Sequence, residues 1–275
     1  MTLSEMRDIL TSRDIQLTKS LGQNFLHDGN QLRRIVEAAN LHPGQRVLEI
    51  GPGLGPLTEV LLEKGCQIVA VEKDARLVEV LEERFYGRDK VVLVHADALE
   101  ELEDVSKDWS AWKLVSNLPY SVASPILVEL AMSPGCPILM VVTLQIEVAR
   151  RIMANAGDDD YGILTLLLQL RYKPAGSFKI PATCFFPVPE VDSACIVLAR
   201  RDQMLLRPGP QTKVFSQVVK EAFSQRRKMM LKLLRERWPQ IKWEECFASL
   251  GIDPMTRAEE VGLEKFVELT KRVSP

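Results

Sequence analysis

The sequence predicts an α/β protein in which a mostly parallel sheet carries helices on both faces and a small α-helical domain follows. Between residues 46 and 145, short apolar segments of strand length alternate with longer segments of helical periodicity. After residue 210 no strand pattern appears and helical periodicity continues to the end. At 275 residues, the chain is long enough for one large domain and one small one.

The alternating region contains five strand candidates and three helix candidates. The strand candidates are residues 46–50, 67–71, 91–94, 113–116 and 138–144. The helix candidates between them are residues 57–64, 75–86 and 121–132. Before the sheet, Asp28 is typical of a helix N-cap, because the apolar residues that follow it recur at helical spacing. These residues are Leu32, Ile35, Val36 and Ala39.

The second half of the chain is less regular. A helix is expected over residues 147–155, and the apolar stretch 162–172 fits a helix or a strand equally. Residues 178–189 hold three prolines and three phenylalanines, which predicts an irregular loop before a strand at 193–199. Helices are expected over the segments 212–222, 226–237 and 263–272. With residues 207–210 as a linker, we expect a sheet domain at 1–204 and a helical domain at 205–275.

Composition excludes several classes of protein. The content of 46% hydrophobic and 26% charged residues is that of a globular protein, and no apolar run reaches the ~18 residues needed to span a bilayer. The first residues lack the layout of a signal peptide, so we expect a cytoplasmic protein without a membrane partner. The five cysteines form no C-x-x-C pair, and none of the three histidines stands at metal-ligand spacing. No metal site is therefore expected.

The net charge of −2 conceals a strong asymmetry. From Arg200 to Lys242 the chain has twelve Lys and Arg against three acidic residues, so this stretch carries +9 and the remainder −11. Segregated charge of this size indicates either a surface that faces a polyanion or a solvated helical face.

The first strand ends in a glycine-rich turn, Glu49 to Gly55, and a helix opens after Pro56. Glycines such as Gly51 and Gly53 at this point allow a ligand to approach the backbone closely. Dinucleotide-binding loops have a G-x-G-x-x-G spacing, whereas here the third glycine comes one residue earlier and Glu49 precedes the loop. A carboxylate repels a pyrophosphate but pairs with the ammonium of a methionyl group. The pattern therefore favours S-adenosylmethionine over a dinucleotide.

Two further acids follow the next strands. Glu72 closes the second strand, where a carboxylate can accept hydrogen bonds from the ribose hydroxyls of an adenosyl cofactor. Asp97 follows the third strand and could accept from an adenine amino group; the alternative is that it caps a helix.

The segment Asn117-Leu118-Pro119-Tyr120, directly after the fourth strand, is the most diagnostic. The lone pair of an adenine amine is delocalised into the ring, and two acceptors for the amine hydrogens favour a nitrogen whose lone pair faces the methyl donor. The Asn117 side chain and the Leu118 carbonyl can supply those acceptors, Pro119 stiffens the backbone and Tyr120 offers a ring for stacking. The alternative is an ordinary Asn-x-Pro turn.

At this point the sequence resembles the ribosomal RNA adenine dimethyltransferase family, which includes the kasugamycin-resistance enzymes. The resemblance covers nearly the whole chain and rests on motifs in a fixed order. These are Leu21 to Leu26, Glu49 to Gly55, Glu72, Asp97 to Leu99, Asn117 to Tyr120, Gln145 with Glu147 to Ala149, Tyr161-Gly162, Phe186 to Pro189, Val191 to Ser193, Ala222 to Lys228 and Arg257 to Glu259.

The resemblance implies a Rossmann-like class I methyltransferase that binds S-adenosylmethionine, with Gln23, Asn24 and Leu26 at the cofactor. It implies that Phe186, in preference to Phe185, sandwiches a flipped adenine against Tyr120. The family converts two neighbouring adenosines in a hairpin loop near the 3′ end of 16S rRNA to N6,N6-dimethyladenosine, during small-subunit assembly.

The basic C-terminal helices would then contact rRNA phosphates through Arg226, Arg227 and Lys228. We expect a monomer that acts on the assembling small ribosomal subunit. One departure from the family is Ile146, where a lysine is usual, and it puts an RNA contact at that position in doubt.

Three other functions compete with this one. The related erythromycin-resistance methylases modify 23S rRNA, but the Ala222 to Lys228 block and Arg257 to Glu259 favour the small-subunit branch. A non-catalytic assembly or transcription factor would not need the intact Asn117 to Tyr120 segment. A NAD(P) oxidoreductase is disfavoured by Glu49 and by the short glycine spacing.

Overall fold

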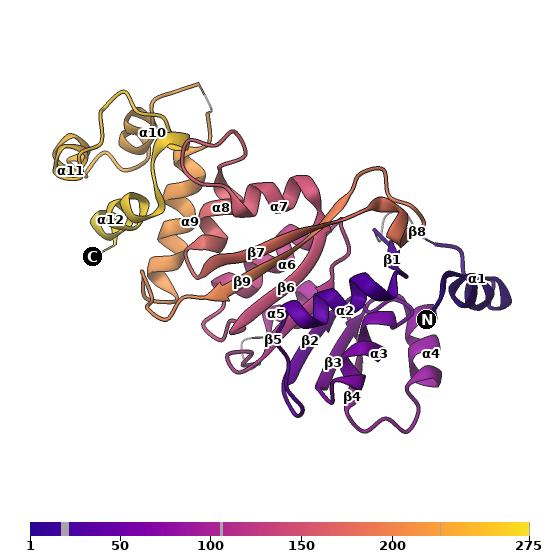
Figure 1. The fold of residues 1–275 in the computed structure, drawn as a ribbon. Helices are drawn as coiled ribbons and strands as arrows, with labels where there is room; N and C mark the ends of the chain where they lie inside the picture. Colours follow the sequence, from indigo (N-terminus) through magenta and orange to yellow (C-terminus); the bar gives the residue numbers. More distant parts are fainter. Residues whose placement is uncertain (18–21, 105–106, 226, 275) are drawn as a thin grey trace. The chain divides into compact units, whose positions relative to one another are not determined.

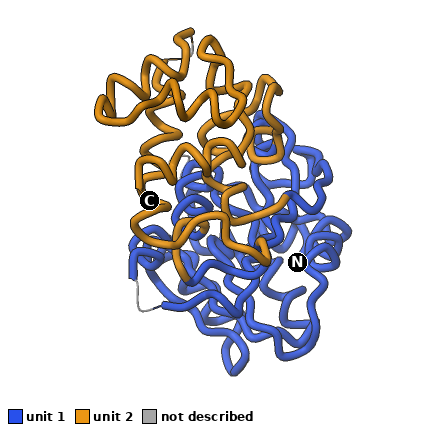
Figure 2. The backbone as a smooth tube through the Cα atoms, turned by 90° about the vertical axis from the view of Figure 1, so that its left-hand side faces the viewer, with its two compact units in different colours: residues 1–130, 135–149, 174–200 blue, residues 131–134, 150–173, 201–275 orange. Residues whose placement is uncertain are grey.

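A computed structural model describes every residue except 18–21, 105–106, 226 and 275. The chain forms two compact units (Figure 2). The first, which we call the sheet unit, comprises residues 1–130, 135–149 and 174–200. The second, the helical unit, comprises residues 131–134, 150–173 and 201–275. The helical unit therefore also includes two segments that precede residue 205, where the sequence analysis set the start of the second domain.

The described residues form a seven-stranded sheet and a separate two-stranded one (Figure 1). The large sheet has the order β4-β3-β2-β5-β6-β9-β7, in which β2, β3, β4, β5 and β6 run parallel and β9 is antiparallel to β6. Its strands are β2 (Arg46–Ile50), β3 (Gln67–Glu72), β4 (Val91–His95), β5 (Lys113–Asn117), β6 (Leu139–Gln145), β7 (Tyr172–Ile180) and β9 (Ser193–Arg200). The small sheet pairs β1 (Phe25–Leu26) with β8 (Phe185–Phe186).

Helices cover both faces of the large sheet. Val47 and Leu48 point to opposite faces of β2, and both are fully buried, as expected for a central parallel strand. One face packs against apolar residues of α2 and α3, among them Ile35 and Leu61. The helices that begin before residue 135 are α1 (Leu3–Ser12), α2 (Gly29–Ala38), α3 (Pro56–Glu63), α4 (Ala75–Arg84), α5 (Ala98–Glu103) and α6 (Ala123–Met132).

The remaining helices lie in residues 146–273. They are α7 (Ile146–Met153), α8 (Ile163–Gln169), α9 (Pro210–Ala222), α10 (Met230–Arg237), α11 (Trp243–Ser249) and α12 (Leu263–Val273). The core of the helical unit is aromatic: Phe215, Trp243, Phe247 and Phe266 are fully buried, and Phe223 stacks on Phe266 with the ring centroids 6.1 Å apart.

The predicted strands are confirmed to within one or two residues, and so are most of the predicted helices. The prediction of an irregular loop at 178–189 is wrong in part, because β7 extends to Ile180 and Phe185–Phe186 pairs with β1. The ambiguous stretch 162–172 is mainly the helix α8. Helices α1 and α11 have no counterpart in the prediction, and α5 was expected only as the helix that Asp97 would cap.

Candidate active site

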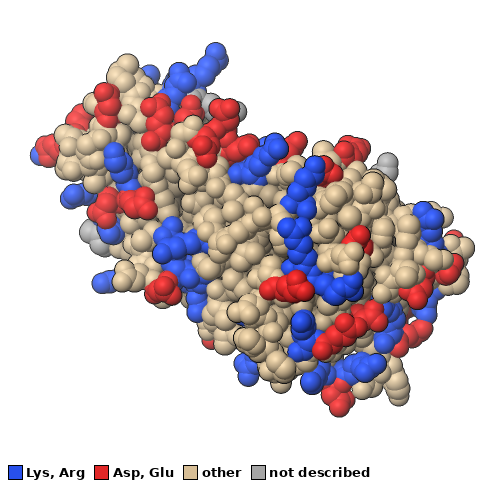
Figure 3. Space-filling model, viewed as in Figure 1, with Lys and Arg blue, Asp and Glu red and all other residues tan. Residues whose placement is uncertain are grey.

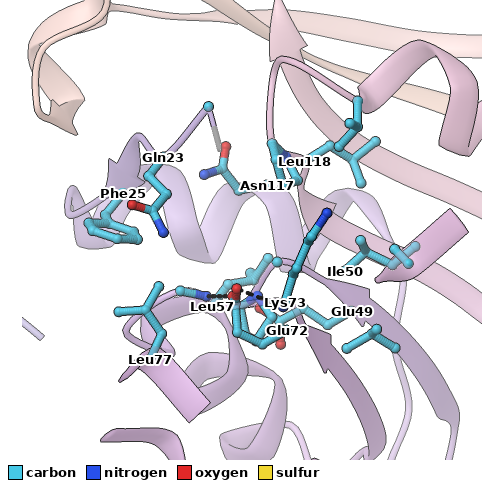
Figure 4. Close-up of a pocket in the computed structure, with 18 of the residues that line it drawn as sticks. Gln23, Phe25, Glu49, Ile50, Leu57, Glu72, Lys73, Leu77, Asn117 and Leu118 are labelled. Carbon is cyan, nitrogen blue, oxygen red and sulfur yellow. Dashed lines mark hydrogen bonds between the residues drawn. The ribbon is translucent and has the colours of Figure 1, made fainter. Parts of the chain in front are cut away.

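The candidate active site is a cavity at the carboxyl ends of β2, β3 and β5 (Figure 4). It holds about 1020 Å³, including space open to solvent, which is enough for a nucleoside-sized ligand. From β2 the chain adds β3 and β4 on one side and then crosses back to add β5 on the other side of β2. Such a topological switch point is where open α/β sheets bind ligands. The predicted cofactor residues all line this cavity: Gln23, Asn24, Leu26, Glu49, Gly51, Gly53, Glu72, Asp97 and Asn117.

The glycine turn requires glycine for steric reasons. Gly51 and Gly53 have φ angles of 68° and 61°, in the left-handed region that side chains disfavour. A Cβ on Gly53 would lie 2.6 Å from the Phe25 ring, and a Cβ on Gly51 would lie 2.9 Å from Pro119. The turn is thus packed directly against the segment before α2 on one side and against the loop after β5 on the other.

Glu49 is a buried carboxyl group beneath this turn. Its exposed fraction is 1%, and its Oε2 accepts a 2.7 Å hydrogen bond from the Thr58 hydroxyl. Burial raises the pKa of Glu49 to about 8, with a smaller contribution from the nearby Glu72 carboxylate. An ammonium group in the cavity would favour the ionised form, so this environment suits a cationic ligand.

Glu72 holds the glycine turn in addition to facing the cavity. Its Oε2 accepts from the Gly53 amide at 3.1 Å, and its Oε1 accepts from the Lys73 and Asp74 amides at 2.9 Å. Burial raises the pKa of Glu72, and these three hydrogen bonds oppose the rise. A carboxylate has about four acceptor positions, so Oε2 keeps capacity for a ligand hydroxyl.

Asp97 caps a helix and also lines the cavity. It is the N-cap of α5, where its Oδ1 accepts from the Leu99 amide at 2.9 Å. Its Oδ2 accepts from the Lys73 ammonium at 2.7 Å, and both side chains line the cavity. The hydrogen bond from Lys73 lowers the pKa of Asp97.

The segment before β1 covers the cavity and is tied to two other elements. The Gln23 side-chain amide donates to Asp74 at 3.0 Å, and Asp74 caps α4. The Asn24 carbonyl accepts from the Asn117 side chain at 2.9 Å, while Leu26 is buried in the core of the sheet unit. Leu21, the first residue of the family motif here, lies outside the described residues.

Asn117 ends β5 with one half of its side-chain amide satisfied. Its Nδ2 donates to the Asn24 carbonyl, whereas its buried Oδ1 receives no hydrogen bond from any described residue. A buried polar atom without a partner is costly, and such atoms are often kept for function. The Leu118 amide donates to the Thr143 carbonyl at 3.1 Å, and this hydrogen bond fixes the turn after β5. In the same turn, the Pro119 ring packs against Gly51.

Tyr120 contacts Phe185 rather than Phe186. The Tyr120 and Phe185 rings meet edge to face with the centroids 6.4 Å apart, and the Tyr120 hydroxyl is hydrogen-bonded to Ser193. Burial raises the pKa of Tyr120 to about 12. Phe186 is the register partner of Phe25, packs in the same apolar cluster and lies under the Arg7 guanidinium. Phe185 and Phe186 thus face opposite sides of β8, and the expected sandwich of an adenine between Phe186 and Tyr120 stays a prediction.

The basic residues of the helical unit differ in their surroundings. Arg227 and Lys228 are exposed in the loop between α9 and α10, and Arg226 lies outside the described residues. Lys213 and Lys220, seven residues apart, lie on the exposed face of α9 and lead toward this loop. Sequence reasoning counted these two lysines but assigned them no role. Figure 3 shows that cationic and acidic side chains are intermixed on the face in view.

In the described parts of the chain, no cluster of three or more His, Cys, Asp or Glu side chains could hold a metal ion. Nor does any helix found there have the length and apolar character needed to cross a membrane.

This sheet order and cavity place the chain among the Rossmann-like, S-adenosylmethionine-dependent methyltransferases. The model of one family, ribosomal RNA adenine dimethylase, matches residues 15–274, and the chain belongs to that family. It is accordingly an rRNA adenine dimethyltransferase that uses S-adenosylmethionine. The cavity fits this cofactor, since it offers a buried acid for the ammonium, close approach to the backbone at Gly51 and Gly53, and Glu72 for a hydroxyl.

Similar proteins span the whole chain. "Ribosomal RNA small subunit methyltransferase A" of Protochlamydia amoebophila is 38% identical over 272 residues, covering 97% of this chain and 94% of the relative. The protein of the same name from Geobacillus kaustophilus is 38% identical and covers 100% and 97%.

Two solved structures resemble the chain over most of its length. The 23S rRNA methyltransferase ErmE is 28% identical with a TM-score of 0.68, covering 91% of this chain and 100% of that one. A dimethyladenosine transferase from Plasmodium falciparum is 22% identical with a TM-score of 0.71, covering 89% and 95%, and it supports the fold alone.

Proposed function

We propose that this enzyme dimethylates the N6 amines of two adjacent adenosines in a hairpin loop near the 3′ end of 16S rRNA, during assembly of the small subunit in the cytoplasm. The observation that carries the chemistry is the Asn117 Oδ1, which is buried and receives no hydrogen bond from any described residue. An adenine NH₂ supplies the missing donor. The choice of 16S rRNA is supported by relatives at 36–39% identity, whose names specify the small subunit.

The reaction needs the amine nitrogen held with its lone pair toward the methyl group. Asn117 Oδ1 and the Leu118 carbonyl accept the two amine hydrogens, and Pro119 holds this loop against Gly51 of the cofactor turn. Bound S-adenosylmethionine supplies an electrophilic methyl on its sulfonium. The protein contributes orientation and local electrostatics, and the site has no need of a covalent intermediate.

A base inside a stack cannot reach this site, so the target adenosine has to be turned out. Tyr120 is the residue of the loop with a ring to stack on. Phe185 is 1% exposed and packs in the core of the sheet unit, so we keep Phe186, which is only partly buried, as the second stacking ring.

The helical unit binds rRNA phosphates and not base edges. Arg227 and Lys228 are exposed, and we include Arg226 because it belongs to the same basic block. Phosphate contacts of this kind supply affinity that falls steeply with salt. We propose a second domain at residues 205–275 for this role, and a monomer as the active form.

The alternative target is an adenosine of 23S rRNA, as in ErmE, which has the lower identity of 28%. The deciding experiment incubates purified enzyme and labelled S-adenosylmethionine with unmethylated small subunits and, separately, with 23S rRNA. Nucleoside mass spectrometry then measures the products. We expect two N6,N6-dimethyladenosines per small subunit and none in 23S rRNA; label only in 23S rRNA would overturn the proposal.

A further inference from the structure

Lys73 is a cation inside a pocket that binds a cation-bearing cofactor. It follows Glu72 at the end of β3, and its side chain lines the cavity (Figure 4). The mechanism above gives it no task. Its ammonium lies 2.7 Å from Asp97 Oδ2, and 60% of the Lys73 side chain is exposed.

The ion pair completes the hydrogen bonding of Asp97. Its Oδ1 accepts from the Leu99 amide at the start of α5, and its Oδ2 accepts from Lys73. Two donors on two different oxygens fix the plane of the carboxylate. Without Lys73, Asp97 would keep only the helix-cap bond and its Oδ2 would be free to turn into solvent.

Asp97 is an ionised carboxylate at neutral pH with or without Lys73, since the ordinary pKa of an Asp is 3.8, so Lys73 acts through the orientation of Asp97. An ionised carboxylate only accepts hydrogen bonds, whereas a protonated one can also donate. Beside the ligand, an acceptor-only group attracts an amino substituent and repels a carbonyl oxygen.

We propose that Lys73 is a positioning residue which, through Asp97, makes the nucleoside end of the pocket selective for a 6-aminopurine over a 6-oxopurine. The inference rests on the proposed contact between Asp97 and the adenine amine. Adenine presents N6–H donors to the carboxylate, while hypoxanthine presents O6, an acceptor, in the same place. Lys73 therefore sets cofactor selectivity without touching the reacting atoms.

The test measures binding by calorimetry with two probes, S-adenosylhomocysteine and S-inosylhomocysteine. We expect Lys73→Met to weaken binding of the adenosyl probe about two- to fivefold, the range of a half-exposed ion pair. It should change binding of the inosyl probe less, so the ratio of the two dissociation constants falls. Lys73→Arg keeps a cation and should restore the ratio. Lys64→Met, an exposed lysine outside the cavity, is the matched control.

An unchanged ratio in Lys73→Met would overturn the inference. So would tighter binding of the adenosyl probe, because Lys73 would then merely compete with adenine for Asp97. Far-UV circular dichroism melts of every variant separate loss of fold from loss of selectivity. If wild-type enzyme methylates small subunits yet shows no preference for the adenosyl probe, only this inference fails; if it neither binds the probe nor methylates, the proposed function fails first.

Discussion

The cofactor pocket and the basic surface of the helical unit use charge in opposite ways. In the pocket, Glu49 and Glu72 are buried at 1% and 8% exposure and are held by hydroxyl or backbone donors. On the helical unit, Arg227 and Lys228 are exposed. A buried carboxyl group depends on the few donors fixed around it, so a single substitution there has a large effect on cofactor binding. Exposed cations each contribute a small part of the RNA affinity, so a large effect appears only when several are replaced.

Replacing Asn117 should give the largest effect of all. Asn117→Ala removes the buried acceptor, and we expect turnover to fall by at least about 100-fold, as for other preorganised electrostatic groups. The dissociation constant of S-adenosylhomocysteine should rise much less than turnover falls, although Asn117 also lines the cofactor cavity and holds the Asn24 carbonyl. Single-turnover methylation of small subunits and calorimetry measure the two. Near-normal turnover would contradict the mechanism.

The acid Glu49 should make cofactor binding depend on pH. Since burial raises the pKa of Glu49 to about 8 in the empty protein, pairing with an ammonium first requires loss of a proton. Affinity for S-adenosylhomocysteine should therefore rise by up to about tenfold per pH unit and level off near pH 8. Glu49→Gln should bind more weakly and lose this slope. A wild-type affinity that is flat between pH 6 and 8 would contradict the assignment.

The same group should affect stability with a definite sign. The folded-state pKa of Glu49, about 8, lies above the ordinary Glu pKa of 4.5, so the folded protein holds the proton more tightly than the unfolded chain. Its contribution to the free energy of unfolding is full below the unfolded pKa and is lost as pH rises through the folded pKa. Urea melts of the ligand-free enzyme should show this decline, and Glu49→Gln should lessen it.

Two neighbouring phenylalanines give the next test, because they lie on opposite sides of β8. Phe186→Leu removes the proposed stacking ring and should lower kcat/KM on small subunits by about tenfold, the contribution expected of one stacked base. Phe185→Leu should lower kcat/KM less, since that ring is buried in the core of the sheet unit and is not open to a base. Both variants need thermal melts as a folding control. The reverse order of effects would make Phe185 the stacking ring.

The basic surface should respond weakly to single changes and clearly to combined ones. Replacing Arg226, Arg227 and Lys228 with Gln should lower subunit affinity and reduce the slope of log K against log salt by about two to three. Lys213→Gln with Lys220→Gln should have a smaller effect. Lys242→Gln is the matched control, because Lys242 is paired with Glu245 at 3.0 Å. An equal loss of subunit affinity in Lys242→Gln would mean that the RNA responds to the net charge of the protein and not to this particular surface.

The same contrast explains what could be predicted from the sequence. Glu49, Glu72, Asp97 and Asn117 each follow or end a strand of the parallel sheet, so their meeting in one cavity follows from the fold. The orientation of Phe185 and Phe186 could not be predicted, because it depends on the pairing of β8 with β1. In that pairing Phe186 lies opposite Phe25, which is 161 residues earlier in the chain. Helix α1 was also missed, although the sequence carries a signal for it: Thr2 and Glu5 form a capping box, and Met6 and Leu10 stand at helical spacing.

The contact between Phe25 and Gly53 has a mechanical consequence. Phe25 belongs to the two-stranded ribbon that ends in the paired phenylalanines, and its ring fills the space where Gly53 would otherwise carry a methyl group. A Cβ on Gly53 would therefore push this ribbon, and Phe186 with it, away from the glycine turn. Glycine at position 53 thus keeps the residues of the proposed base site in place.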